Sequence, residues 1–159
     1  MTGASGAGPG VQSCGSVRKV RLTITGRQTD PEGHTQENTA VYRAEAVYAA
    51  GEEGFRFRYQ EGDGESSLFV SRSLVCIHRG ERGGTQIRFD PAVPGTECMY
   101  ATPYGTIPMR IRTRRIAVLD GRSRPGPDEK LRLRARVQYE LRMDEAFCLE
   151  CTVTIRAEE

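Results

Sequence analysis

The most regular feature of this sequence is an alternation of apolar and polar residues with a period of two. Residues 20–25 alternate aliphatic side chains with arginine and threonine, and residues 55–59 alternate aromatic side chains with arginine. This period is typical of a β-strand that buries one face and exposes the other. Strands are predicted at residues 20–25, 39–48, 55–59, 68–70, 74–77, 85–89, 97–101, 107–118, 131–141 and 147–155. The segments 68–70 and 74–77 form either one bent strand or two short ones.

The strand predicted at residues 107–118 changes its buried face partway along. Its apolar side chains first occupy odd positions, but Ile116 and Val118 occupy even ones. A strand with a period of two can change faces only through an extra residue. The sequence therefore predicts a β-bulge near Arg114 and Arg115.

Turn residues separate the predicted strands, and no segment shows the 3.6-residue period of an amphipathic helix. Glycine, proline and aspartate concentrate at residues 30–33, 62–64 and 121–128, which are typical turn compositions. Many consecutive strands joined by short turns favour an all-β fold, an antiparallel up-and-down β-barrel of about eight to ten strands. Residues 1–16, rich in glycine, alanine and serine, are expected to be a disordered tail. Residues 17–159 are then a single β-barrel domain.

Four short motifs are similar to those of a known family. They are Val-Arg-Leu-Thr-Ile-Thr-Gly at residues 20–26, Tyr-Gln-Glu-Gly at 59–62, Thr-Pro-Tyr-Gly at 102–105 and Arg-Thr-Arg at 112–114. In this order they resemble the YwiB-like bacterial proteins, an uncharacterised family of calycin-type, lipocalin-like β-barrels. The resemblance implies a barrel that can hold a small ligand, and it implies no enzymatic activity.

Five cysteines are scattered along the chain, at positions 14, 76, 98, 148 and 151. An odd, dispersed set is a poor disulfide framework, and the N-terminus lacks the charged start and apolar run of a signal peptide. These features favour reduced thiols in a cytoplasmic protein. Cys148 and Cys151 form a lone CxxC motif, but residues three apart on a strand point to opposite faces. No metal site and no cofactor is predicted.

Arginine supplies almost all of the positive charge. The formal net charge is +2, and Lys19 and Lys130 are the only lysines. Two stripes, Arg110, Arg112 and Arg114 on one strand and Arg132, Arg134 and Arg136 on the next, stand opposite the apolar faces. If these strands pair, like charges come close together on the outer wall, which is destabilising. Neighbouring carboxylates such as Glu140 and Glu150, the solvent, or a bound anion can offset this repulsion.

Two binding functions are open. The first, which the resemblance to the YwiB-like barrels implies, is binding of a small apolar or amphipathic ligand inside the barrel, with Tyr104 at the mouth and Arg112 or Arg114 turned inward beside the bulge. The second is an adaptor that binds RNA, phosphate or an acidic protein through outward arginines. These surface arginines are Arg110, Arg132, Arg134 and Arg136. No aromatic side chains interleave with them, so bases have no stacking platform there.

Other classes of function have little support in the sequence. No nucleophile, base or metal constellation indicates an enzyme. No apolar stretch approaches the roughly 18 residues of a membrane span, so no membrane partner is predicted. Edge strands of an incompletely closed barrel can pair between chains, which leaves both a monomer and a homodimer open.

Overall fold

The computed structural model describes residues 16–80, 85–102, 104–121, 124–143 and 147–159. The strands are β1 (Arg18–Thr29), β2 (Thr35–Ala49), β3 (Gly54–Glu61), β4 (Gly64–Ser71), β5 (Val75–Arg79), β6 (Thr85–Phe89), β7 (Thr96–Thr102), β8 (Gly105–Asp120), β9 (Arg132–Arg142) and β10 (Cys148–Glu158), with a 3-10 helix η1 (Ala50–Glu52) between β2 and β3. The disordered tail predicted at residues 1–16 falls, apart from Ser16, outside the described residues. No described helix has the length and apolar character needed to cross a membrane.

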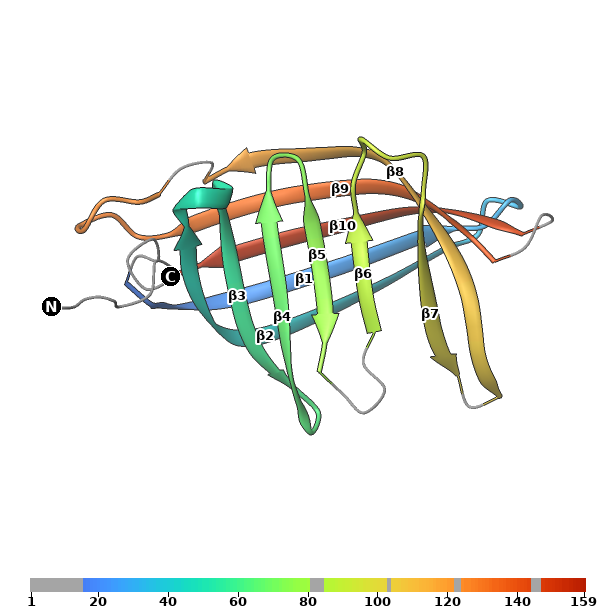
Figure 1. Cartoon of the computed structure of the whole chain (residues 1–159), viewed down its shortest axis with the longest axis horizontal. Helices are drawn as coiled ribbons and strands as arrows, with labels where there is room; N and C mark the ends of the chain where they lie inside the picture. The colour runs from blue at the N-terminus through green and yellow to red at the C-terminus, as the bar shows by residue number, and fades with distance from the viewer. Residues whose placement is uncertain (1–15, 81–84, 103, 122–123, 144–146) are drawn as a thin grey trace, which may run out of the picture.

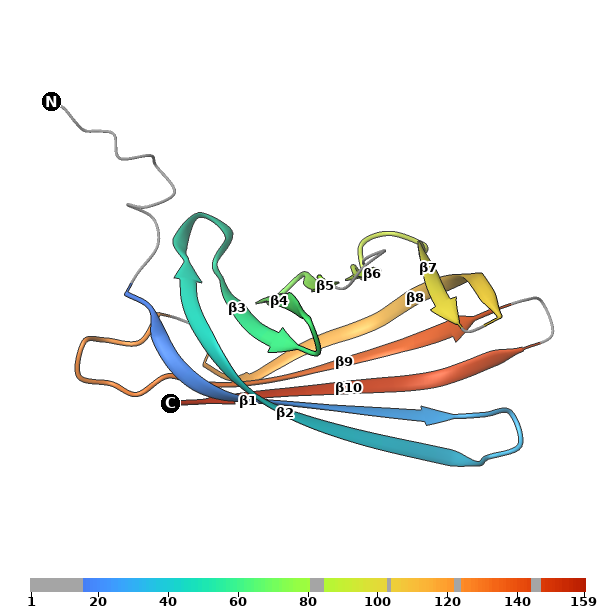
Figure 2. The same ribbon diagram turned by 90° about the horizontal axis from the view of Figure 1, so that it is seen from below.

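All ten strands belong to one antiparallel sheet in the order β6-β5-β4-β3-β2-β1-β10-β9-β8-β7. Strands that are consecutive in sequence pair with each other, except β6 and β7, and β1 also pairs with β10. The sheet curves round until β6 and β7 lie at its two edges (Figure 1). The long strands β1, β2, β8, β9 and β10 lie on one side and the shorter β3 to β6 on the other (Figure 2). The result is the nearly closed up-and-down barrel that the sequence predicts.

The edges of the sheet meet without a hydrogen-bonded ladder between β6 and β7 in the described part of the chain. The Thr96 hydroxyl on β7 donates to the backbone carbonyl of Arg88 on β6 over 2.8 Å. From inside, Phe89 of β6 packs against Tyr139 of β9 with their ring centroids 4.6 Å apart. Contacts of side chains therefore join β6 to β7 at this seam, whereas backbone hydrogen bonds join the other neighbouring strands.

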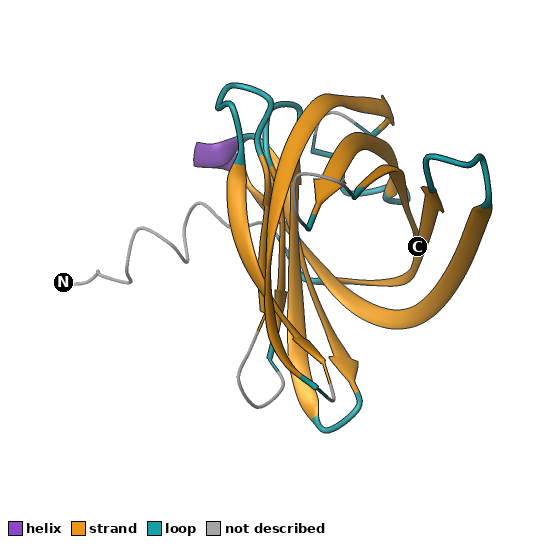
Figure 3. Ribbon diagram, turned by 90° about the vertical axis from the view of Figure 1, so that its right-hand side faces the viewer, coloured by secondary structure: helices purple, strands orange, loops and turns teal. Residues whose placement is uncertain are grey.

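The inward residues of the strands form one contiguous apolar cluster, and the strands curve around it (Figure 3). Phe57, Leu22 and Ile155 are completely buried. Burying such a side chain contributes about 1.5–3 kcal/mol to folding. The described interior is therefore filled by side chains at the level of this cluster. Its large side chains include Phe55, Phe57, Tyr59, Met109 and, packed against them, Tyr139.

The predicted β-bulge on β8 is confirmed. Thr113 faces Tyr139 of β9, and Arg115 faces the preceding residue, Gln138, so the register shifts across Arg114. The extra residue moves the inward face to Ile116. A second irregularity in β8, after Val118, has no counterpart in the sequence analysis.

The segment predicted as one bent strand or two short ones forms two strands, β4 and β5. Ser71 makes the turn between them: its hydroxyl donates to the carbonyl of Leu74 (3.2 Å) and accepts from that residue's N–H (3.1 Å). The predicted hairpin turn at 62–64 is also present, with Gly62 at a φ of 59°. Glycine adopts this left-handed conformation at low cost, which explains its position there.

Candidate functional site: a basic outer wall

Twelve basic side chains point outward from four neighbouring strands, three from β1, four from β8, four from β9 and one from β10. They are Lys19, Arg21, Arg27, Arg110, Arg112, Arg114, Arg115, Arg132, Arg134, Arg136, Arg142 and Arg156. We call this surface the basic wall. Because these strands lie side by side in the order β1-β10-β9-β8, the wall is one continuous surface.

Four carboxylates share this outward face, and the structure describes every residue of the four strands. They are Asp120, Glu140, Glu150 and Glu158. Arg114 contacts both Glu140 and Glu150 at 2.9 Å, as the sequence analysis expected of these two acids. Arg142 and Arg156 each contact one carboxylate. The other nine basic groups of the wall have no ion pair within the described part of the chain.

Arginines face each other directly across neighbouring strands at three places. The pairs are Arg21 with Arg43 of β2, Arg134 with Arg156, and Arg110 with Arg142. Like charges placed directly opposite destabilise a sheet. Solvent weakens the repulsion at these exposed positions, but a bound anion would remove more of it. The wall is therefore suited to negatively charged partners.

The register separates the two predicted arginine stripes along the wall. Arg110 and Arg112 face the end of β9, opposite Arg142 and Glu140. Arg134 instead faces Asp120, beyond the bulge. The expectation that the stripes on β8 and β9 lie against each other is therefore wrong, because antiparallel pairing places them at opposite ends of the two strands.

The alternative in which Arg112 or Arg114 turns inward is also wrong. Both side chains are exposed on the outer face, because the bulge adds Arg114 as an extra outward residue while Thr113 and Ile116 take the inward positions. Tyr104, which is 99% exposed, lies between β7 and β8. It precedes Arg112 by eight residues of extended chain, or about 26 Å. The structure does not bring these three predicted site residues together.

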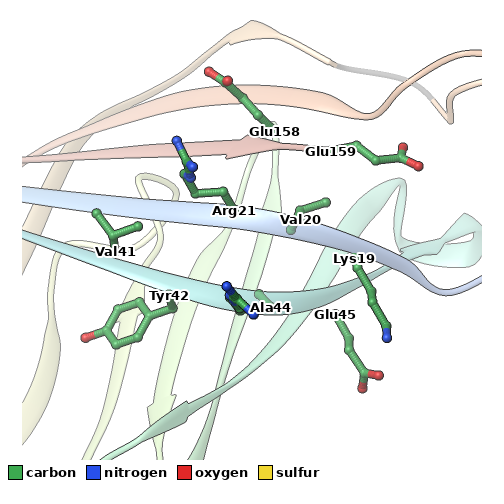
Figure 4. A pocket seen from close by; sticks show the side chains of 10 residues that line it. Lys19, Val20, Arg21, Val41, Tyr42, Ala44, Glu45, Glu158 and Glu159 are labelled. Atoms are coloured by element: carbon green, nitrogen blue, oxygen red, sulfur yellow. The ribbon is translucent and has the colours of Figure 1, made fainter.

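A groove of about 990 Å³ lies at the border of the basic wall, where β10, β1 and β2 adjoin. Arg21 and Arg43 line its centre, and Glu158 flanks them on β10. Lys19 and Glu45, which face each other in register, extend in the same direction at one side (Figure 4). The groove therefore has a mixed lining, with three basic side chains (Lys19, Arg21 and Arg43) and three acidic ones (Glu45, Glu158 and Glu159).

Threonine hydroxyls occupy much of the outer face between the arginines. They belong to Thr23, Thr25 and Thr29 of β1, Thr35 and Thr39 of β2, and Thr152 and Thr154 of β10. Cross-strand pairs of these hydroxyls bond each other, Thr25 with Thr39 at 3.1 Å and Thr29 with Thr35 at 3.0 Å. Hydroxyl groups beside arginines are a combination that contacts phosphate oxygens in protein–nucleic acid complexes.

One arginine does turn inward, at the start of β1. Arg18 donates to the carboxylate of Glu159 and to the carbonyl of Gly126, each at 2.9 Å, and to the carbonyl of Glu129. Its charge is therefore balanced by a carboxylate, as an inward arginine requires. An inward Arg18 was not predicted, although Arg18 has the same parity as the inward residue Val20, and this alternation indicates its direction.

A second polar cluster points into the barrel near the β3–β4 turn, away from the basic wall. The Tyr42 hydroxyl donates to Glu61 at 2.9 Å, and the Ser66 hydroxyl donates to the same carboxylate at 3.1 Å. Arg79 lies 3.7 Å from it. Burial and the bond to Glu61 raise the pKa of Tyr42. Every group in this cluster has a partner within it, so it offers no vacant ligand site.

The CxxC motif does not form a two-thiol site. Cys148 faces Arg142 on the outer side of the sheet, and Cys151 faces Tyr139 on the inner side. Burial raises the pKa of both thiols, that of Cys151 to about 11. The described cysteines are free thiols. Within the described ranges, no group of three His, Cys, Asp or Glu side chains is arranged to hold a metal ion.

Comparison with known proteins agrees with this fold. A family described as "Domain of unknown function (DUF1934)" matches residues 22–155. Among solved structures, the chain is similar to the ywiB protein from Bacillus subtilis, with a TM-score of 0.61 and 16% sequence identity over 93% of this chain and 97% of that chain. At this identity the similarity concerns the fold alone. No curated protein matches the sequence. The YwiB-like resemblance and the calycin-like barrel predicted from the sequence are confirmed.

Proposed function

The chain belongs to the DUF1934 family of domains of unknown function, and we propose that it binds nucleic acid through the phosphate backbone on its basic wall. The observation that carries this proposal is the charge of the wall: twelve basic groups against four carboxylates on four adjacent strands. The whole chain has a net charge of only +2, so the positive charge is concentrated on this side. Such a concentration attracts polyanions at long range and holds them by displacing counterions.

The side-chain types favour phosphate contacts that do not depend on base sequence. The planar guanidinium fork matches two phosphate oxygens, and the neighbouring threonine hydroxyls can donate to others. No aromatic side chain points outward from β1, β8, β9 or β10. Bases therefore have no stacking surface on the wall, and we expect little preference among sequences.

Fluorescence anisotropy with a labelled single-stranded RNA, at several salt concentrations, tests this proposal. We expect affinity to fall linearly on a log–log plot against salt. A variant with Arg132→Gln, Arg134→Gln and Arg136→Gln should lower the magnitude of the slope by about 2, because each lost phosphate contact removes about 0.7. The matched control replaces Arg56, Arg58 and Arg88 with glutamine, because these three arginines lie on β3 and β6, outside the basic wall, and already have acidic partners.

Three outcomes would contradict the proposal. They are a wild-type affinity that does not change with salt, an equal loss of affinity in the control variant, and salt-dependent binding to poly-glutamate with none to RNA. The last result would assign the wall to acidic proteins.

A small-molecule site has one supporting observation of its own. Beside Arg18, a pocket of about 340 Å³ is lined by Ala46, Tyr48, Phe55 and Leu131. This volume lies at the lower end of the range for ligand pockets, and its apolar walls and two arginines, Arg18 and Arg124, suit a small amphipathic carboxylate. Arg18 is already paired with Glu159, so Arg124, which has no ion pair within the described residues, is the group that would meet the carboxylate. Native mass spectrometry of protein purified from its own host tests it: a bound mass of a few hundred daltons that survives nuclease supports the site, and the mass of the bare chain argues against it.

A further inference from the structure

A small basic pocket lies at the end of the wall where β7 adjoins β8. It has a volume of about 330 Å³ and is lined by Pro94, Arg110, Arg112, Glu140 and Arg142. Arg110 and Arg142 face each other across β8 and β9, and Arg112 faces Glu140 in the next pair on the same face. Three arginines and one glutamate therefore line the pocket.

Both oxygens of the Glu140 carboxylate already accept a hydrogen bond from an arginine. One oxygen accepts a hydrogen bond from Arg142 at 3.0 Å, and the other accepts from Arg114 at 2.9 Å. Its side chain is only 12% exposed. The bonds from Arg142 and Arg114 hold the pKa of Glu140 below its ordinary value, so the group is ionised at neutral pH. Glu140 thus fixes Arg142 in position, and it makes no ion pair with Arg112, which faces it in register.

Arg110 and Arg112 retain their hydrogen-bonding capacity. Neither has an ion pair in the described part of the chain, although Glu97 of β7 stands opposite Arg110 in register. The guanidinium of Arg110 lies close over Gly95: a Cβ atom at that position would be 2.8 Å from Nε of Arg110. The turn that carries Pro94 and Gly95 therefore lies against the Arg110 side chain and lines one side of the pocket.

We propose that this pocket binds a phosphomonoester, such as the terminal phosphate of a nucleic acid strand. The inference rests on the proposed function and assigns a specific contact within it. A phosphomonoester carries about −1.5 to −2 charges near pH 7 and presents three acceptor oxygens, which suits two uncommitted arginine forks and a third arginine beside them. An internal phosphodiester carries less charge, and its nucleic acid strand continues in both directions. The turn at Pro94 lines one side of the pocket, which favours a phosphate at the end of a strand.

The test compares two otherwise identical single-stranded RNAs, one with a 5′-phosphate and one with a 5′-hydroxyl, in fluorescence anisotropy at fixed salt. We expect the wild-type protein to bind the phosphorylated RNA about tenfold more tightly, the size of effect that one strong charge-assisted contact produces. An Arg110→Gln, Arg112→Gln variant should bind both RNAs equally. An Arg134→Gln, Arg136→Gln variant, altered on the wall but outside the pocket, should lose affinity for both RNAs and keep the tenfold ratio.

The outcomes separate this inference from the proposed function. Equal wild-type affinity for the two RNAs, with salt-dependent binding intact, overturns the pocket alone. A preference that survives in the Arg110→Gln, Arg112→Gln variant also overturns it. No salt-dependent binding of either RNA overturns the proposed function and the inference together. A preference that inorganic phosphate abolishes at millimolar concentration, while binding of the 5′-hydroxyl RNA persists, supports the pocket as the site of the terminal phosphate.

Discussion

Thr113 is the inward residue of β8 that immediately precedes the bulge, and its hydroxyl is unusual. The residue is 6% exposed, and its oxygen has no hydrogen-bond partner among the described residues. It faces the ring of Tyr139 across the strand pair. We expect Thr113→Val to stabilise the protein, because valine keeps the branched shape and removes the buried polar group.

The magnitude follows from the cost of leaving a polar group buried without a partner. That cost is about 1–3 kcal/mol, and the slight difference in shape between the two side chains reduces the gain. We therefore expect a net increase of about 1 kcal/mol in the free energy of unfolding. For a domain of this size, such a change raises Tm by roughly 2–4 °C.

The assay is urea unfolding followed by intrinsic tyrosine fluorescence or circular dichroism, supported by a thermal melt. The matched control is Thr25→Val, because Thr25 lies on the outer face and bonds Thr39 at 3.1 Å. Removing that exposed bond should change the stability by no more than about 0.5 kcal/mol. A Thr113→Val protein that is less stable than wild type, with an unchanged m-value, would refute the reasoning and imply that the hydroxyl has a partner such as a buried water.

Three further predictions concern the seam, the wall and the thiols. Phe89→Ala should destabilise the protein by about 3–5 kcal/mol and speed amide hydrogen exchange in β6, since Phe89 closes the seam from inside; unchanged exchange in β6 would argue against that role. Because the folded pKa of Glu140 is lowered from its usual 4.5, its contribution to stability is present above that pH and is lost as pH falls through the folded value. The free energies of unfolding of wild type and Glu140→Gln, measured with urea, should therefore approach each other as the pH falls below 4.5. A difference that stays constant from neutral pH to about pH 3 would contradict this expectation. Under mild oxidation, non-reducing peptide mapping should find no disulfide between Cys148 and Cys151, because they lie on opposite faces of β10; a linked peptide would show that the strand opens.

The sequence predicts the strands and the bulge because both depend on local alternation. The parity change between Met109 and Ile116 can be read directly, and it places the bulge at Arg114, where the structure has it. The outward direction of the arginines follows from the same alternation. The inward direction of Arg18 could have been predicted in the same way, since Arg18 continues the inward series of β1.

The relation between strands could not be read from the sequence. Whether Arg134 lies beside Arg112 or beside Asp120 depends on the pairing register of β8 with β9, which the turn and two irregularities determine together. The seam between β6 and β7 could not be predicted from the sequence either, because no local pattern in these two strands distinguishes strands that pair from strands that only lie side by side. The third arginine of the phosphomonoester pocket, Arg142, likewise joins Arg110 only through the register.

The alternation along β9 places the determinants of stability and of binding on opposite faces of one strand. Leu133, Ala135 and Val137 are almost completely buried in the core, while Arg134 and Arg136 between them point outward from the basic wall. Removing an inward side chain of this kind leaves a cavity and costs several kilocalories per mole, whereas an exposed arginine can be replaced at little cost to folding. Stability and binding can therefore be perturbed separately within five consecutive residues. A substitution at Arg134 or Arg136 that weakens RNA binding without lowering Tm reports on the wall itself, which is the separation that a surface function of this barrel requires.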